Sequence, residues 1–154
     1  MAKIKRIVVH CTGTEAGVPV DKEYLHHLFF DINAWRHWGY HAIIQPDGRV
    51  VTLQPWPRQT RDGGTIDNAS LANGAKGYNH DSLHVAYVGG LEPGSKRPKD
   101  TRTEAQKTAL RNLIEQWKAA YKIDIVVGHR DLPGVKKACP CFDAIKEYNH
   151  GKTA

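Results

Sequence analysis

Two histidines and one cysteine are the residues of this 154-residue chain whose types and positions best suit chemistry. His10 follows Arg6-Ile7-Val8-Val9, and His129 comes soon after a second mainly β-branched, apolar run at residues 123–127. Such runs are typical of buried strands, and the carboxyl ends of neighbouring parallel strands meet at one edge of a sheet. If the two strands are neighbours, His10, His129 and the nearby Cys139 supply two imidazoles and a thiolate. That set predicts a zinc site with one open position.

The segment around Cys139 adds a second chemical group. Lys137 and Cys139 are separated by one residue, so in an extended segment their side chains point to one face. Pro140 suits the first position of a helix whose apolar side carries Phe142, Ile145 and Tyr148. We therefore expect the sulfur of Cys139 to lie at a helix N-terminus, where the helix dipole favours a thiolate.

The first half of the chain predicts a helix and a hairpin. Asp21 is a suitable N-cap for a helix with an apolar stripe made of Tyr24, Leu25, Leu28, Phe29, Ile32 and Trp35. Residues 40–44 and 50–53 flank a Pro-Asp-Gly turn and predict a β-hairpin, in which Tyr40, Ala42 and Ile44 share a face. Residues 54–78 lack apolar periodicity and predict a long surface loop.

The second half predicts a strand at residues 83–88 and a long helix opened by a Thr103/Gln106 capping box. The apolar stripe of that helix consists of Leu110, Leu113, Ile114, Trp117 and Tyr121. No repeat or boundary divides the chain. We expect one α/β domain over residues 1–154, a central mixed β-sheet with helices packed on it.

Composition limits the class of protein without choosing a partner. The 22 Lys and Arg residues exceed the 16 Asp and Glu residues, and the net charge of +6 favours an anionic partner such as nucleic acid or the cell wall. Three cysteines imply no disulfide framework. No apolar run is long enough for membrane insertion, and the N-terminus shows no signal-peptide pattern. We expect synthesis in the cytoplasm, with release towards any outside substrate by another factor.

Five ordered blocks that span almost the whole chain carry a resemblance to a known family. They are Val9-His10-Cys11, Gly39-Tyr40-His41-Ala42-Ile43-Ile44, Ala75-Lys76-Gly77-Tyr78-Asn79-His80, Val88-Gly89-Gly90, and Lys137-Ala138-Cys139-Pro140 with Phe142-Asp143. In these blocks the chain resembles the zinc-dependent N-acetylmuramoyl-L-alanine amidases of the phage-lysozyme and peptidoglycan-recognition-protein superfamily.

The resemblance implies an activity and roles for named residues. It implies hydrolysis of the amide between N-acetylmuramic acid and L-alanine in peptidoglycan, with Zn²⁺ as cofactor. The Lys-Ala-Cys-Pro match selects Cys139 over Cys141 as the sulfur ligand beside His10 and His129. Tyr40 and Lys137 match the catalytic tyrosine and lysine of the family. Substrate contacts are predicted for Thr12, Asn79 and His80.

The chain lacks a catalytic residue that one branch of the superfamily has, and two other functions fit its sequence. One branch of the superfamily has a catalytic glutamate on the strand before the Gly-Gly turn, whereas residues 84–88 here contain no carboxylate, which favours the Tyr/Lys branch. We expect a monomer, no stable binding of nucleic acid and no inhibition of RNA polymerase. The alternatives are a non-catalytic peptidoglycan-recognition or basic nucleic-acid-binding module, and a thiol hydrolase with Cys139 as nucleophile and His129 as base.

Overall fold

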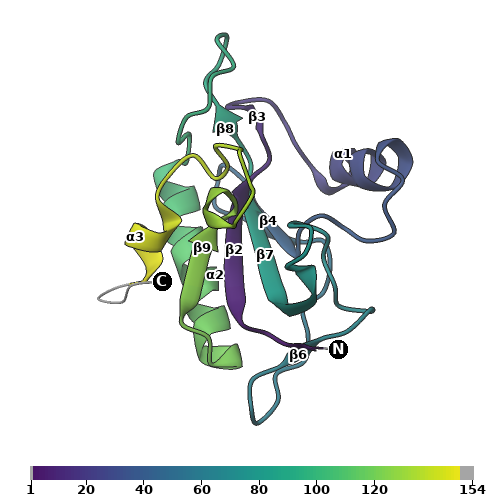
Figure 1. Ribbon diagram of the computed structural model, residues 1–154. Coiled ribbons are helices and arrows are strands. Elements are labelled where there is room, and N and C mark those ends of the chain that lie inside the picture. The colour runs from purple at the N-terminus through teal and green to yellow at the C-terminus, as the bar shows by residue number, and fades with distance from the viewer. Residues whose placement is uncertain (1, 150–154) are drawn as a thin grey trace.

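A five-stranded mixed sheet forms the centre of the molecule (Figure 1). The computed structural model describes residues 2–149, so the two ends of the predicted domain lie outside the described residues. The strand order is β5-β4-β7-β2-β9, with all neighbours parallel except the β4/β5 hairpin. The strands are β2 (Arg6–Cys11), β4 (Ala42–Ile44), β5 (Val50–Thr52), β7 (Ser82–Tyr87) and β9 (Ile125–Gly128). The predicted mixed sheet is confirmed.

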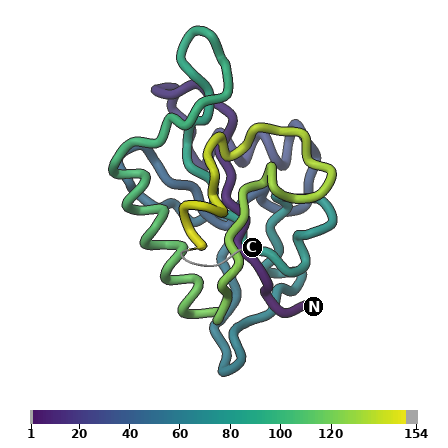
Figure 2. Tube along the Cα trace, turned by 60° about the vertical axis from the view of Figure 1, so that its left-hand side comes forward, coloured from purple at the N-terminus to yellow at the C-terminus, as the bar shows by residue number. Residues whose placement is uncertain are grey.

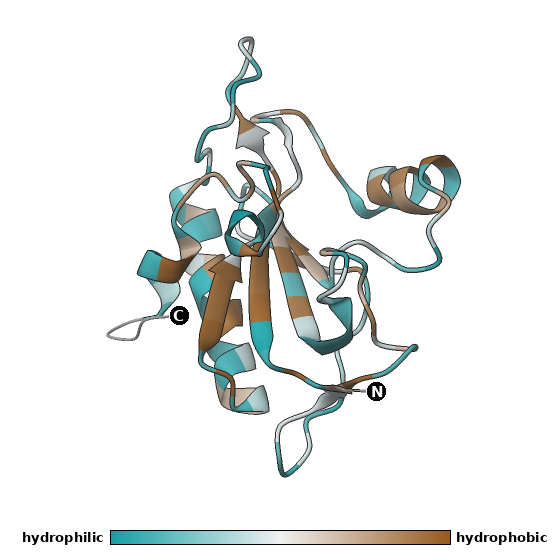
Figure 3. Ribbon diagram, viewed as in Figure 1, coloured by the Kyte–Doolittle hydropathy of each residue, from teal (hydrophilic) through white to brown (hydrophobic). Residues whose placement is uncertain are grey.

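One face of the sheet is covered by the long helix α2 (Glu104–Tyr121), which runs along it in Figure 2. Thr103 and Gln106 form the predicted capping box, and all five residues of the predicted apolar stripe are buried. The brown strands of Figure 3 show the apolar sheet that this stripe meets. The short helix α3 (Ala144–Tyr148) packs beside β9 at the edge. This face holds the main core, which includes Cys11, and Cys139 and Cys141 pack against this core.

The opposite face carries the polar chemistry. Residues paired across parallel strands point to the same side, and His10 in β2 pairs with Ala86 while Val8 pairs with His84. The helical segment formed by α1 (Lys22–His26) and the π-helical turn η1 (His27–Ile32) supplies apolar cover here, and it stands away from the sheet in Figure 1. Cys11 points the other way, as strand alternation predicts.

Short elements tie the loops to this frame. Two small sheets pair β1 (Ala2–Lys3) with β6 (Thr65–Ile66), and β3 (Thr14–Glu15) with β8 (Gly90–Leu91). Two single 3₁₀ turns, η2 (Asn79–Asp81) and η3 (His129–Asp131), precede β7 and follow β9. Within the described residues no helix is long and apolar enough to cross a membrane.

Three local expectations were wrong. Asp21 caps the first helix as predicted, but the helical segment ends at Ile32, and Tyr24 and Ile32 are 49% and 63% exposed because the segment contacts the sheet on one narrow side only. Tyr40 does not share a face with Ala42, because β4 begins only at Ala42 and the strand alternation does not extend back to Tyr40. Its ring instead packs against Phe29 on the opposite side, with ring centroids 5.6 Å apart.

The third correction concerns the last helix. Pro140 does not open it, since the helix begins at Ala144, where the side chain of Asp143 accepts a hydrogen bond from the backbone N–H of Lys146. The Cys139–Pro140 bond is cis, and Cys139 lies in the loop that leads from η3 to the helix. Cys139 is therefore not in the first turn of α3, and the predicted effect of that helix's dipole on its sulfur does not apply.

His41 links β4, β7 and the following loop. Its Nε2 donates to the Ser70 carbonyl at 2.8 Å, and its Nδ1 accepts from the backbone N–H of His84 at 3.0 Å. Burial, only partly offset by the Ser70 hydrogen bond, lowers the pKa of His41 from 6.5 to about 4. The folded chain therefore holds His41 neutral over a pH range in which the unfolded chain protonates it.

Acid should weaken the fold through this residue. Between pH 6.5 and about 4 the unfolded state binds a proton that the folded state does not, so the free energy of unfolding falls by about 1.4 kcal/mol per pH unit from His41 alone. Urea unfolding of metal-free wild type and His41→Asn across this range measures the effect. The pH slope of the variant should be shallower by about that amount. Equal slopes would show that His41 does not titrate in this way.

Candidate active site

The strand pairing brings two imidazoles and a thiol together at one end of the sheet. His10 lies in β2 and His129 follows β9, and because these strands are parallel neighbours the two rings lie with centroids 4.7 Å apart. Cys139 reaches the same point from the loop after η3, with its sulfur 3.9 Å from Nδ1 of His10. One potential ligand atom from each residue lies within 4.8 Å of the others. The predicted convergence of these three residues is present in the structure.

Both imidazoles are held neutral. Burial, followed by the nearby His129 and the positive charge of Lys137, lowers the pKa of His10 well below its ordinary value. Burial and Lys137 also lower the pKa of His129. Neutral imidazole nitrogens have a lone pair for a metal ion, whereas protonated ones do not. Both rings are therefore in the state that ligation requires at neutral pH.

Hydrogen bonds favour the thiolate form of Cys139, and their effect on its pKa outweighs that of burial, which acts in the opposite direction. A hydrogen bond from the side chain of Cys11 is the largest cause of its lowered pKa, and the backbone N–H of Cys11, 3.2 Å from the sulfur, and the Lys137 charge act in the same direction. The neighbouring thiols differ: the pKa of Cys11 is raised far above its usual value, and burial raises that of Cys141 to about 12. Of the three thiols, Cys139 is therefore the one that loses its proton most readily.

This donor set fits a zinc ion. Four-coordinate zinc with two nitrogen ligands and one sulfur ligand places its ligand atoms roughly 3.4 to 3.6 Å apart. The sulfur of Cys139 and Nδ1 of His10 are 3.9 Å apart, and all three ligand atoms lie within 4.8 Å of one another, so small side-chain shifts would bring them to that spacing. Two imidazoles and a thiolate also favour zinc over magnesium or calcium, which prefer oxygen ligands.

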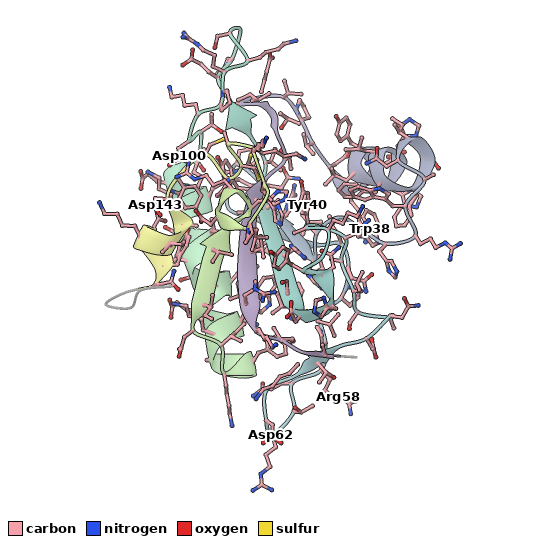
Figure 4. The ribbon with its side chains drawn as sticks, in the orientation of Figure 1. Trp38, Tyr40, Arg58, Asp62, Asp100 and Asp143 are labelled. Atoms are coloured by element: carbon pink, nitrogen blue, oxygen red, sulfur yellow. The ribbon has the colours of Figure 1, made fainter. Side chains whose placement is uncertain are left out.

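Tyr40 and Lys137 lie on the wall around these ligands. The ring of Tyr40 lies 5.2 Å from that of His10, and its hydroxyl donates to the carbonyl of Cys11 at 3.4 Å. Burial, with Cys139 and Cys11 nearby, raises the pKa of Tyr40, so its phenol stays protonated and can donate. Lys137 is exposed and lines the same hollow. In Figure 4 Tyr40 lies near the upper ends of the central strands, whereas Arg58 and Asp62 lie at the opposite end of the molecule.

Two adjoining cavities form a groove over the site. The first, about 220 Å³, is lined by His10, His129, Cys139, Tyr40 and Lys137 among others. The second, about 630 Å³, continues past it along the loop that contains Ala75 and Tyr78. The residues that line both are Trp35, Asn73, Gly74, His129 and Lys137. A ligand that lies along the groove would therefore pass directly over the three candidate metal ligands.

Of the three residues predicted to contact substrate, only Thr12 lines a cavity of the groove. Thr12 lines the first cavity, although its hydroxyl also accepts from the backbone N–H of Gly89. Asn79 and His80 line neither cavity: Asn79 bonds Asn73 and the backbone of Ala75, which shapes the groove loop, and the His80 side chain is 62% exposed. Contact with substrate stays a prediction for all three residues.

Sequence reasoning missed two residues of the site. Asn73 lines both cavities, and no pattern in the sequence marks it. His84 contacts His10 from β7, with Nδ1 2.9 Å from Nε2 of His10. The sequence does show a single histidine in the middle of an apolar strand, which marks His84 as unusual. Its contact with His10 could not be predicted, because the sequence does not show that β7 is the neighbour of β2.

Comparison with known proteins identifies the family. A model of the family described as N-acetylmuramoyl-L-alanine amidase matches residues 1–142. The chain belongs to this family. The resemblance drawn from the five sequence blocks is therefore confirmed, and the protein is an amidase that acts on peptidoglycan.

Curated relatives of this amidase include phage endolysins. It is 33% identical over 138 residues to the endolysin of Klebsiella phage KP32, which covers 90% of this chain and 81% of that protein. It is 32% identical over 137 residues to the endolysin of Escherichia phage T7, with coverage of 89% and 80%.

Solved structures share the fold of this amidase. The endolysin N-acetylmuramoyl-L-alanine amidase LysCS from Clostridium intestinale superposes with a TM-score of 0.72 at 19% identity, covering 97% of this chain and 83% of that chain. Drosophila PGRP-LB gives a TM-score of 0.66 at 18% identity, with coverage of 96% and 80%. At these identities the comparison concerns the fold alone, and it confirms the predicted fold class.

The difference in pKa among the three thiols predicts selective alkylation. In metal-free amidase at pH 7 to 8, iodoacetamide should modify Cys139 well before Cys11 or Cys141, because the thiolate is the reactive form. Peptide mass spectrometry over time measures the order, and added zinc should protect Cys139. The Cys139→Ser variant is the control and should react slowly. Modification of Cys141 at an equal rate would contradict the assignment of the thiolate.

Proposed function

We propose that this amidase cleaves the N-acetylmuramoyl-L-alanine bond with a zinc ion held by His10, His129 and Cys139, and with Tyr40 and Lys137 as its catalytic side chains. Two neutral imidazoles and a cysteine whose pKa is lowered converge in the lining of one cavity, and this convergence supports the proposal. When bound, zinc in such a site lowers the pKa of a water molecule from 15.7 towards about 7 and polarises a carbonyl.

The protein side chains would act on the charge that develops during hydrolysis. As the amide carbonyl becomes tetrahedral, its oxygen gains negative charge, and donors placed beforehand stabilise that charge most effectively. Tyr40 offers a phenol that burial keeps protonated, and Lys137 offers an ammonium group at the rim. The two groups lie on the wall of the same cavity, so one carbonyl oxygen could contact both of them.

The groove supports a substrate of extended shape. Its two cavities share His129 and Lys137, so the room for a bound chain extends from the proposed metal in the first cavity into the second. Trp35 lies at this junction with its ring stacked on Phe29, at 5.3 Å and an interplanar angle of 10°. A flat apolar surface beside a polar groove suits the mixed sugar and peptide character of peptidoglycan.

The reaction products distinguish the proposal from its alternatives. Purified peptidoglycan digested by the wild type should yield new L-alanine amino termini and no new reducing sugar ends. The release should stop with a chelator and return with added zinc. A thiol hydrolase would survive the chelator, and a recognition module would bind the wall without releasing amino termini. Either result would overturn the zinc mechanism.

Tyr40 and Lys137 should matter for rate rather than for metal binding. Tyr40→Phe and Lys137→Met should each lower kcat by about 10²- to 10³-fold, as expected when one oxyanion donor is removed. Zinc content, measured by mass spectrometry of metals, should stay at wild-type level. Lys136→Met is the matched control, because Lys136 is exposed and lines neither cavity. Variants of Tyr40 and Lys137 as active as the control would remove both residues from the mechanism.

A further inference from the structure

His84 is a buried histidine in the middle of β7 that the proposed reaction does not use directly. Its side chain is completely buried and lies on the same sheet face as His10. Its Nδ1 is 2.9 Å from Nε2 of His10, so the two imidazoles share one hydrogen bond. His84 lines neither cavity of the groove, and hence has no direct contact with a substrate there.

The position of the shared proton follows from the geometry of His10. Nδ1 of His10 faces the sulfur of Cys139 at 3.9 Å, so this nitrogen is the one that points to the proposed metal. A nitrogen that binds metal carries no proton, and a neutral imidazole then carries its proton on the other nitrogen. Nε2 of His10 must therefore donate, and Nδ1 of His84 must accept.

The hydrogen bond between His10 and His84 leaves another buried polar atom of His84 without a partner. With Nδ1 as acceptor, the proton of neutral His84 lies on Nε2, and this buried atom has no hydrogen-bond partner among the described residues. A buried donor without a hydrogen-bond partner destabilises the fold. A leucine at position 84 would avoid this destabilisation. The histidine is therefore unfavourable for stability unless its Nδ1 has a function.

Gly74 and His41 of the same chain surround the ring of His84. A Cβ added at Gly74 would lie 2.5 Å from Nδ1 of His84, so the absence of a side chain at residue 74 makes space for the imidazole. On the other side the backbone N–H of His84 donates to His41, whose ring lies nearly parallel to that of His84, with an interplanar angle of 6°. The His84 ring therefore has a defined location before any metal binds.

We infer that His84 is a positioning residue for the metal centre: it accepts a hydrogen bond from Nε2–H of His10 and thereby directs the unprotonated Nδ1 of His10 to zinc. The inference rests on the proposed zinc site. Metal-ligating histidines commonly donate their second nitrogen to an outer partner, and loss of such a partner lowers metal affinity by about 10- to 100-fold. Here the partner is a second imidazole from the adjacent parallel strand.

Two variants of nearly equal shape test the acceptor. In His84→Asn the amide oxygen takes the place of Nδ1 and still accepts from His10, whereas His84→Leu has a methyl group at that point. Zinc affinity, measured by competition with a chromophoric chelator, should fall about 10- to 100-fold in His84→Leu and remain within about threefold of wild type in His84→Asn. The absorption spectrum of the cobalt-substituted protein should change in the leucine variant alone.

Ser82→Ala is the matched control for loss of a buried polar group. Ser82 is completely buried on the same strand and face as His84, but it bonds Arg6 at 2.9 Å and not a candidate ligand. Its zinc affinity should equal that of wild type. Wild-type affinity in folded His84→Leu, or equal losses in the leucine, asparagine and alanine variants, would overturn the inference.

A measurement on the wild type covers the case in which His84→Leu does not fold. Nitrogen NMR of the histidines in the zinc-loaded protein should show His10 with its proton on Nε2 and its metal on Nδ1. The opposite tautomer would overturn the role of His84. If wild type binds no zinc at all, the zinc mechanism itself fails, which is a different result from zinc binding that ignores residue 84.

Discussion

The parallel pairing of β2 with β7 on one side and with β9 on the other is the constraint on which the site depends. The register sets Val8 opposite His84 and Val9 opposite Gly128, so His10 lies between His84 and His129. A slip of one residue would turn every side chain of β2 to the opposite face. His10 would then enter the apolar core under α2. Because burial of an imidazole without hydrogen-bond partners is unfavourable, this register is disfavoured.

Burial on this face also sets the charges of the site. Removal of water disfavours the protonated form of each imidazole, while backbone and thiol donors from Cys11 favour the thiolate of Cys139. Two neighbouring residues of β2 thus serve the site: His10 is a candidate ligand, and Cys11 donates hydrogen bonds to the candidate ligand Cys139. Tyr40 stays protonated for the reason that keeps the histidines neutral, since burial opposes the charged form in both cases.

Patterns that depend on neighbours along the chain were predictable from the sequence. The Thr103/Gln106 capping box and the stripe of α2 are such patterns, and so is the placement of His10 and His129 at the ends of buried strands. The surroundings of Cys139 were not, because its thiolate is stabilised by Cys11 from the far end of the chain and not by the helix that follows it. The face of Tyr40 was missed for a similar reason, since packing against Phe29 decided it. His84 gains its meaning only from the strand order, which no local pattern encodes.

X-ray absorption at the zinc edge of the loaded protein measures the coordination of zinc by His10, His129 and Cys139. We expect one zinc per chain with two nitrogen neighbours at about 2.0–2.1 Å, one sulfur at about 2.3 Å and one further oxygen. In Cys139→Ser the sulfur signal should disappear, and in Cys141→Ser it should remain. A zinc shell without sulfur in wild type, or a sulfur signal that persists in Cys139→Ser, would rule out this set of ligands.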